Sequence, residues 1–447
     1  MRKFGLTVII PALIGLLTPF TGFGQVLGIE GESHTSVGIY IKDIKADTVV
    51  FAAESERNLV PASILKSYTT ATALNILGSD YRFKTAVYAD GTVSDSVLDG
   101  SIRVVPGGDP TLESRQFSNN SGFADSIVCA LKRNGISVIT GNVSVDCSDT
   151  EGGPVPQWEI DDVAWSYGAG IHRFNYRDNT FTYNPATGKC DPEIPGMKVE
   201  LLPNRSGLNV VRGIWSETLY AFTSDRTSKG AFRSTVPFPH KVFEAELSQK
   251  LNAAGITVKG EKTAKGTNNT ELYVHRSLPL REILKSLMFR SDNMFAEGCL
   301  LALSGDGNRS AALKRQIEHW SAKGLDSKYV TAVDGSGLAR VNRVSPRFMA
   351  DMLQAMANSK NSELYTSFFP RVGKEGTVKS FLKGTALEGR MALKTGSMNG
   401  VQCYAGYAFD TDDKPSHVVV VMINGFFCSR DCLRTAITRF LLNNVKI

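Results

Sequence analysis

Three short groups of residues have the types and spacing needed to cut an amide bond. The first is Ser63-Ile64-Leu65-Lys66. On a helix, residues three apart share a face, so the Ser63 hydroxyl and the Lys66 amine would lie within mutual reach. A serine needs a base to attack an amide at neutral pH, and a lysine supplies one when burial lowers its pKa. Alone, this SxxK pattern is a weak signal, because it also occurs on ordinary helix surfaces.

The other two groups are Ser291-Asp292-Asn293 and Lys394-Thr395-Gly396-Ser397. The Ser291 hydroxyl could relay a proton and the Asn293 amide could hold a substrate carbonyl, although these residue types also favour turns and helix caps. The charge of Lys394 and the hydroxyls of Thr395 and Ser397 suit a substrate carboxylate, and Gly396 permits close approach of another backbone segment. An ordinary strand end with a bulge could have the same sequence. A phosphate loop is excluded, because there the glycine precedes the lysine and a helix follows.

The order of the three groups is far more specific than any one of them. SxxK, SDN and KTG in succession form a known signature of β-lactamases and penicillin-binding proteins. The chain resembles the class C low-molecular-mass penicillin-binding proteins, the D-alanyl-D-alanine carboxypeptidase/endopeptidase family of serine peptidases, from about Val37 to Leu442. Ser63 and Ser291 are 228 positions apart. This family carries extra domains in that interval, whereas the interval is much shorter in class A β-lactamases. Further resembling stretches are 59–63, 107–112, 291–297, 334–340, 376–377 and 406–407.

The resemblance implies a role for each matched motif residue. Ser63 would be the acylated nucleophile and Lys66 its general base. Ser291 and Lys394 would move the proton to the departing D-alanine, and Asn293 would bind the substrate backbone. No metal or other cofactor is expected, since the chain has no HExxH and no Cys/His ligand spacing.

The resemblance also implies the residues that bind substrate. Backbone N–H groups of Ser63 and Ser397 would form the oxyanion hole. A pocket for the side chain of the peptidoglycan diamino acid would include Asp162, although Asp161 is adjacent and an ordinary loop carboxylate is the alternative. The predicted substrate-binding residues are Thr395, Gly396, Ser397, Arg340, Met398, Asp162 and Tyr167.

Two positions depart from the family pattern. Ile64 and Leu65 are more apolar than the usual pair between the serine and the lysine, so we expect them to face the core or to line the cleft. Ser397 replaces the more usual threonine and keeps the hydroxyl.

The elements that must position these residues are readable in outline. The pattern predicts an α/β (α+β) fold, and the resemblance implies a β-lactamase/transpeptidase-like body of antiparallel sheet and helices. The body comprises residues 25–85 and 275–447, and a β-rich insertion at 86–274 contains two nested domains. Expected strands are 36–42, 48–52, 85–88, 101–105, 143–145, 199–202, 390–394, 401–409 and 417–424. Expected helices are 61–77, 123–134, 241–254, 280–304, 309–323, 346–358, 375–382 and 429–443.

Residues 1–24 have the pattern of a secretory signal peptide. Arg2 and Lys3 precede an apolar run of 11 residues at 7–17, and Gly22 and Gly24 suit a cut before Gln25. A buried N-terminal helix is the alternative, which Pro11 disfavours. No later apolar run reaches the length of a membrane span, so we expect a periplasmic or secreted protein without a transmembrane anchor.

The composition narrows the class of protein. The 447 residues are 42% hydrophobic and 21% charged, with a net charge of +6, and no run is rich in Lys and Arg. This is typical of a globular chain and speaks against a nucleic-acid partner. Seven cysteines leave at least one thiol free; Cys428 with Cys432, and Cys147 with Cys190, are possible pairs.

The sequence therefore predicts a serine D-alanyl-D-alanine carboxypeptidase/endopeptidase that acts on peptidoglycan stem peptides through an acyl-enzyme on Ser63. Its partners would be those peptides and β-lactam antibiotics; its oligomeric state is not readable from the sequence. The alternative is a catalytically weak penicillin-sensing or cell-wall-binding protein on the same fold. An esterase or β-lactamase is disfavoured by the large insertion.

Overall fold

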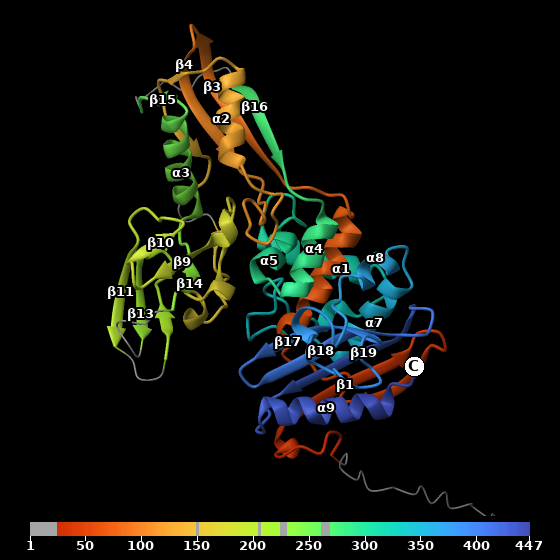
Figure 1. Cartoon of the computed structure of the whole chain (residues 1–447). Helices are drawn as coiled ribbons and strands as arrows, with labels where there is room; N and C mark the ends of the chain where they lie inside the picture. The colour runs from red at the N-terminus through yellow and green to blue at the C-terminus, as the bar shows by residue number, and fades with distance from the viewer. Residues whose placement is uncertain (1–24, 149–151, 204–206, 224–229, 261–268) are drawn as a thin grey trace, which may run out of the picture.

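The computed structural model describes residues 25–148, 152–203, 207–223, 230–260 and 269–447. The predicted signal peptide, residues 1–24, lies outside the described residues. In Figure 1 the body occupies one side of the molecule, and the insertion rises from it as two further lobes.

The centre of the body is a five-stranded antiparallel sheet built from both ends of the chain. Its strand order is β17-β18-β19-β1-β2. The hairpin predicted at 36–52 forms one edge, and β19 joins it to the C-terminal strands. The strands are β1 (Ser36–Asp43), β2 (Thr48–Ala53), β17 (Met391–Met398), β18 (Val401–Phe409) and β19 (Pro415–Asn424).

Helices cover both faces of this sheet (Figure 1). On one face lies α9 (Arg430–Asn444), which buries Leu433, Ile437 and Leu441 at a spacing of four residues. The other face carries the larger core and the remaining helices. These are α1 (Leu65–Leu77), α4 (Leu280–Arg290), α5 (Asn293–Leu301), α6 (Arg309–Ser321), α7 (Pro346–Ala357) and α8 (Ser362–Thr366).

Helix α1 is the central helix of the body. All ten residues from Leu65 to Leu74 are buried, including polar ones, because α1 lies beneath α4, α5, α6 and α7. A short 3₁₀ turn, η2 (Ala62–Ile64), leads into it, and Gly78 ends it with a φ of 84°. The helix predicted from Pro61 to Leu77 is therefore present, with its first turn tightened.

The insertion contains one six-stranded sheet and three smaller ones. The six-stranded sheet has the order β15-β5-β4-β3-β16, with β6 beside β4. Its strands are β3 (Lys84–Ser94), β4 (Val97–Val105), β5 (Val138–Ile139), β6 (Val143–Val145), β15 (Thr257–Val258) and β16 (Asn269–Arg276). The smaller sheets contain β7 (Gly152–Gly153), β8 (Ile171–His172), β9 (Thr180–Asn184), β10 (Lys189–Asp191), β11 (Lys198–Pro203), β12 (Asn209–Val211), β13 (Thr218–Thr223) and β14 (Phe232–Thr235).

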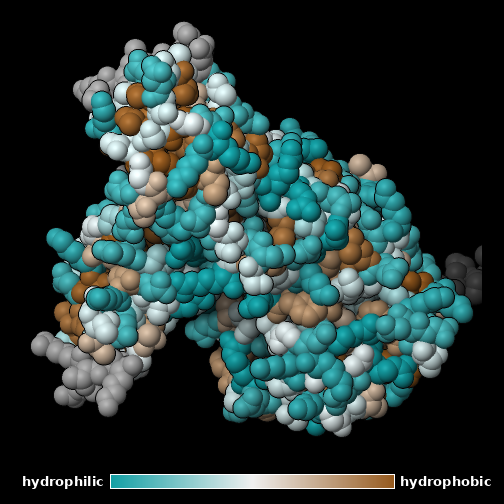
Figure 2. Space-filling view, turned by 45° about the horizontal axis from the view of Figure 1, so that its top comes forward, coloured by the Kyte–Doolittle hydropathy of each residue, from teal (hydrophilic) through white to brown (hydrophobic). Residues whose placement is uncertain are grey.

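Two helices, α2 (Phe123–Arg133) and α3 (Pro239–Ala253), pack together in the insertion, and one continuous apolar core joins its parts. The edge strand β16 pairs with β3, and these two strands cross the predicted boundaries near residues 85 and 274. Division of the insertion into two nested domains remains a prediction. In the space-filling view, hydrophilic residues cover most of the visible face, and a deep indentation separates the insertion from the body (Figure 2).

Three expectations need revision. The helix expected at 280–304 is broken at Ser291, which adopts a left-handed conformation with φ of 60°. The helix expected at 375–382 is only the 3₁₀ turn η7 (Gly376–Val378), since Gly373, Gly376 and Leu382 all have positive φ. All seven cysteines are free, and neither suggested pair is bonded.

Candidate active site

Ser63 and Lys66 stand at the junction of η2 and α1. The Lys66 Nζ donates to the Ser63 Oγ over 2.8 Å, as the predicted spacing requires. Ser63 is half-buried, whereas Lys66 is fully buried. The preceding residue, Ala62, has a φ of 46°, a conformation that residues with a side chain adopt only where the surroundings enforce it. The predicted nucleophile thus sits on a constrained turn.

The amine of Lys66 has two further acceptors. It donates to the Asn293 Oδ1 and to the Ser336 carbonyl oxygen, each over 2.6 Å. Burial lowers the pKa of Lys66 to about 8, although the charges of Asp334, Asp292 and Glu297 oppose the shift. A lysine with this pKa holds a useful fraction of the neutral amine near neutral pH, which is the form that accepts a proton.

The Ser291-Asp292-Asn293 group forms the break between α4 and α5. Ser291 ends α4, and the Asp292 side chain caps α5 by accepting from the Phe295 N–H over 2.9 Å. This is the helix cap that the residue types favour. The break turns the Ser291 hydroxyl toward Lys394 and the Asn293 amide toward Lys66.

Lys394 lies on β17 and is fully buried. Its Nζ donates to the Ser291 Oγ and to the Thr395 carbonyl oxygen, both over 2.8 Å. Burial and the nearby charge of Lys66 lower the pKa of Lys394 well below its usual range. Two buried amines and two serine hydroxyls therefore form two hydrogen-bonded pairs, and the charge of Lys66 is close enough to act on Lys394.

Two glycines let neighbouring segments close on the nucleophile turn. A Cβ on Gly396 would lie 2.5 Å from the Pro61 carbonyl oxygen and 3.1 Å from the Ser63 nitrogen. Gly337 has a φ of 78°, and a Cβ there would lie 1.9 Å from the Ala62 carbonyl oxygen. Gly396 is therefore needed for close approach, as predicted, and it brings β17 against η2.

Two buried carboxylates hold the loop 334–339 against Lys66. The Glu297 Oε1 accepts from the Gly335 and Ser336 N–H groups, each over 2.9 Å, and the Glu297 carboxylate pairs with Arg309. Asp334 accepts from several backbone N–H groups of the same loop. Both residues lie in stretches that resemble the family, but nothing in their local sequence indicates that they fix the Ser336 carbonyl.

The insertion supplies one wall of the site. The Tyr167 hydroxyl donates to the Asp162 Oδ1 over 2.8 Å, and the Asn293 Nδ2 donates to the Tyr167 carbonyl oxygen over 2.7 Å. Burial raises the pKa of Asp162. Arg340 pairs with Glu159 over 2.8 Å. Glu159 was not predicted from the sequence, because a single carboxylate in an irregular stretch does not indicate a binding site.

These groups surround a cavity of about 490 Å³. Eight of the predicted site residues line it, and the two lysines lie buried behind. Thr395 stands beside it, and its hydroxyl donates to the Thr377 Oγ1 over 2.8 Å. Ile64 and Leu65 belong to the core and do not line the cavity. The lining residues are Ser63, Glu159, Asp162, Tyr167, Ser291, Asn293, Gly337, Leu338, Arg340, Ser397, Met398 and Asn399.

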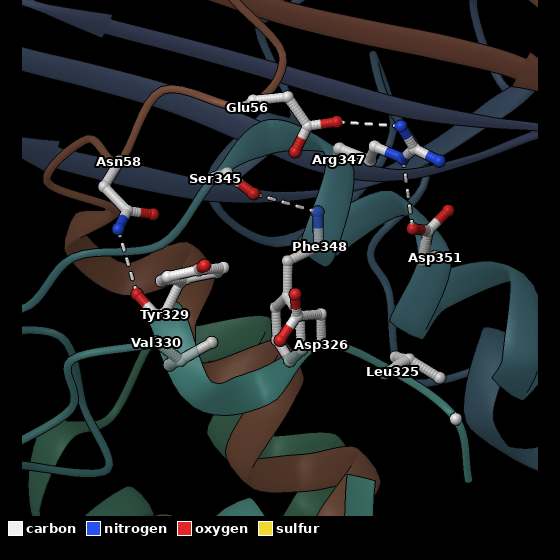
Figure 3. Close-up of a pocket in the computed structure, with 11 residues that line it drawn as sticks. Glu56, Asn58, Leu325, Asp326, Tyr329, Val330, Ser345, Arg347, Phe348 and Asp351 are labelled. Atoms are coloured by element: carbon white, nitrogen blue, oxygen red, sulfur yellow. Dashed lines mark hydrogen bonds and ion pairs between the residues drawn. The ribbon is translucent and has the colours of Figure 1, made fainter. Parts of the chain in front are cut away.

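A larger cavity, of about 750 Å³, lies elsewhere on the body (Figure 3). None of the motif residues lines it. Its one arginine, Arg347, pairs with Glu56 over 2.8 Å and with Asp351 over 3.6 Å. Its lining therefore has three carboxylates, of Glu56, Asp326 and Asp351, against this one arginine, and it contains no nucleophile beside a base.

The chain matches a known family of peptidases over most of its length. The D-Ala-D-Ala carboxypeptidase 3 (S13) family matches residues 29–199 and 224–440, well over half of the chain. The chain belongs to this family. The predicted membership, the fold class and the activity of a serine-type D-Ala-D-Ala carboxypeptidase are thereby confirmed.

Individual relatives of this S13 peptidase are distant but align over most of its length. A D-alanyl-D-alanine carboxypeptidase of Actinomadura sp. (strain R39) is 26% identical over 83% of this chain and 74% of its own. The crystal structure of penicillin binding protein 4 (dacB) from Haemophilus influenzae is similar with a TM-score of 0.77 at 23% identity, over 92% of this chain and 96% of that one. Its complex with a β-lactam is similar with a TM-score of 0.74 at 23% identity, over 93% and 96%.

The described residues of the S13 peptidase contain no cluster of three or more His, Cys, Asp or Glu side chains arranged to hold a metal ion. None of their helices is long and apolar enough to cross a bilayer.

Proposed function

We propose that the S13 peptidase cleaves the D-Ala-D-Ala bond of peptidoglycan stem peptides through an acyl-enzyme on Ser63. Neutral Lys66 accepts the Ser63 proton as the Oγ attacks the penultimate D-alanine carbonyl. Collapse of the tetrahedral intermediate breaks the amide bond, and the leaving D-alanine nitrogen takes a proton through Ser291 and Lys394. Water then hydrolyses the ester, which releases the shortened peptide and restores the Ser63 hydroxyl.

The observation that carries this proposal is the contact between Ser63 and a buried lysine. The Nζ–Oγ distance of 2.8 Å is a hydrogen-bond distance, and burial is the main cause of the lowered Lys66 pKa. General-base catalysis needs this combination of reach and a pKa near the working pH. The presence of both serine–lysine pairs also speaks against the alternative of a catalytically weak sensor.

The remaining site residues would hold the substrate in register. The Asn293 amide would bind the peptide backbone, and the Thr395 and Ser397 hydroxyls would bind the terminal carboxylate. The backbone N–H groups of Ser63 and Ser397 would form the oxyanion hole, where one lost donor typically costs 10²–10³ in rate. Asp162, Tyr167, Arg340 and Met398 would contact the side chain of the diamino acid. The same chemistry applies when the leaving group is a cross-linked stem peptide.

Labelled penicillin tests the nucleophile. A β-lactam acylates the serine as the peptide does, so the wild type should carry the label covalently and Ser63→Ala should not. Ser367→Ala, which alters an exposed serine on another part of the body, is the matched control. Equal labelling of Ser63→Ala would reject the assignment.

Turnover of a peptide ending in D-Ala-D-Ala separates the enzyme from the sensor. Release of free D-alanine, detected by mass, supports the proposal; penicillin labelling without any release would favour the sensor. Digestion of peptidoglycan dimers in the same assay shows whether cross-links are also split.

Export to the periplasm or the medium is part of the proposal. The charge and apolar pattern of residues 1–24 supports it, and so does a substrate located in the cell wall. N-terminal sequencing of the mature protein should begin at Gln25; a mature chain that retains Met1 would contradict export by this route.

A further inference from the structure

Arg430 reaches from the start of α9 to the edge of the active-site cavity. Its Nη1 donates to the Ser397 Oγ over 2.5 Å and to the Gln402 Oε1 over 3.0 Å. Its Nη2 donates to the Met398 carbonyl oxygen over 2.6 Å. A further, longer contact joins Nη1 to the Val401 carbonyl oxygen. Four neutral acceptors therefore hold one guanidinium in place.

The positive charge of Arg430 is not balanced by the protein. Among the described residues no carboxylate forms an ion pair with it, although the side chain is exposed. Two arginines that line cavities differ from it. Arg340 pairs with Glu159, and Arg347 of the larger cavity has Glu56 on one side and Asp351 on the other (Figure 3). A rigidly held cation without a counterion is suited to an anionic ligand.

The contact with Arg430 decides whether the Ser397 hydroxyl donates or accepts a hydrogen bond in the cavity. Because the Ser397 Oγ accepts from Arg430, its own hydrogen is free to donate to a group in the cavity. The cavity lining includes Ser397 and Met398, both of which touch Arg430. A carboxylate bound here would receive a hydroxyl hydrogen bond and lie beside a fixed positive charge.

We propose that Arg430 is a specificity-determining residue that binds, together with Ser397, the α-carboxylate of the departing D-alanine. This rests on the proposed function. Gln402 is then a positioning residue, since it accepts from the guanidinium and stands opposite Ser397 in the β17–β18 pair. None of the three sequence motifs contains Arg430. It lies near the cavity because α9 begins there.

The test compares two peptides, one ending in D-Ala-D-Ala and one in D-Ala-D-alaninamide, in wild type and Arg430→Gln. The wild type should prefer the free carboxylate. Arg430→Gln should lower kcat/KM for that peptide about 10- to 100-fold, the range of a charge-assisted hydrogen bond, and should change the amide peptide less than about 2-fold.

Arg434→Gln is the matched control. It removes the same charge one turn further along α9, where the Arg434 Nη2 contacts the Ser380 Oγ over 3.0 Å, and should leave the preference unchanged. If Arg430→Gln only loosened the β17–β18 hairpin, cleavage of both peptides would slow equally, and this result would overturn the inference. An unchanged preference of Arg430→Gln for the free carboxylate would also overturn it. If the wild type cleaved neither peptide, the proposed function would fall as well.

Discussion

The body and the insertion contribute to one cavity in opposite ways. The body places its reactive amines, Lys66 and Lys394, where water does not reach them. The insertion contributes Asp162 and Tyr167, and the Tyr167 side chain remains 49% exposed. Most apolar residues of the two parts belong to different cores, but Ala169 and Ile171 of the insertion pack into the core of the body, and a small cluster of Val155, Trp158 and Ala339 also joins the two parts.

The contrast separates chemistry from recognition. A lysine acts as a base at neutral pH only if burial favours its neutral form, and only a packed core provides that burial. A wall that recognises a substrate side chain must instead be open to solvent before the substrate arrives. Changes in the body should therefore alter the rate of acylation for every substrate, whereas changes in the insertion wall should alter the choice between substrates.

The largest effect should follow loss of the base in the body. Lys66→Met keeps the length of the side chain but cannot accept the Ser63 proton, so acylation by penicillin should slow by about 10³-fold or more. Stopped-flow acylation rates test this. Lys328→Met, at an exposed lysine of the body, should behave as wild type, and a thermal melt checks that Lys66→Met still folds. Near-normal acylation of Lys66→Met would show that another group is the base.

The second effect is the pH dependence of acylation. Lys66 must be neutral to accept a proton and its pKa is about 8, so the protonated form predominates below that pH. The acylation rate should rise about 50-fold between pH 6 and pH 8 and level off above, following the neutral fraction of one group. A rate that is flat or falls over this interval would contradict Lys66 as the base.

A smaller and selective effect is expected in the insertion wall. Asp162→Asn removes a negative charge beside the cavity, so kcat/KM for a peptide with a free amine on the diamino acid should fall about 10-fold. A peptide with that amine acetylated should be cleaved as before. Asp161→Asn, at the exposed neighbour, is the control. Equal losses on both peptides would place Asp162 in the chemistry common to all substrates.

The smallest effect should come from one hydrogen bond between the two regions. The Trp158 Nε1 donates to the Asp334 Oδ2 over 2.9 Å, and Asp334 also holds the loop that carries the Ser336 carbonyl. Trp158→Phe should slow acylation about 3- to 5-fold, equivalent to about 1 kcal/mol for one hydrogen bond. Trp215→Phe, at a partly exposed tryptophan of the insertion, should have no effect. If Trp158→Phe and Trp215→Phe had equal acylation rates, the insertion would not influence the chemistry through this hydrogen bond.

The sequence predicts the parts of the site that depend on local spacing. Ser63 and Lys66 are one helical turn apart, and Ser291 and Asn293 flank an aspartate cap, so their types and order suffice. Arg430, Glu159 and Trp158 escaped prediction because their partners lie far away in the chain. Long-range contacts of this kind depend on how β17, α9 and the insertion pack together.

The ends of some helices were also not predicted from the sequence. The apolar period of 280–304 continues through Ser291, and only the left-handed backbone of that residue separates α4 from α5. At 375–382 an apolar pattern is present, but positive φ angles on both sides leave a single 3₁₀ turn. Periodicity reports which residues are buried, and it does not report where the backbone bends.

The central sheet of the body has a consequence for the order of folding. In the β1–β19 pair Tyr40 stands opposite Val420, 380 positions later, so the contact must close a loop that contains the whole insertion. Closing a long loop is entropically unfavourable, and structures dominated by such contacts fold slowly. The turn that carries Ser63 packs against β17, so its surroundings are complete only after the C-terminal strands have joined the sheet. A chain emerging from its N-terminus carries Ser63 early but gains a working site only when nearly all of it has been synthesised.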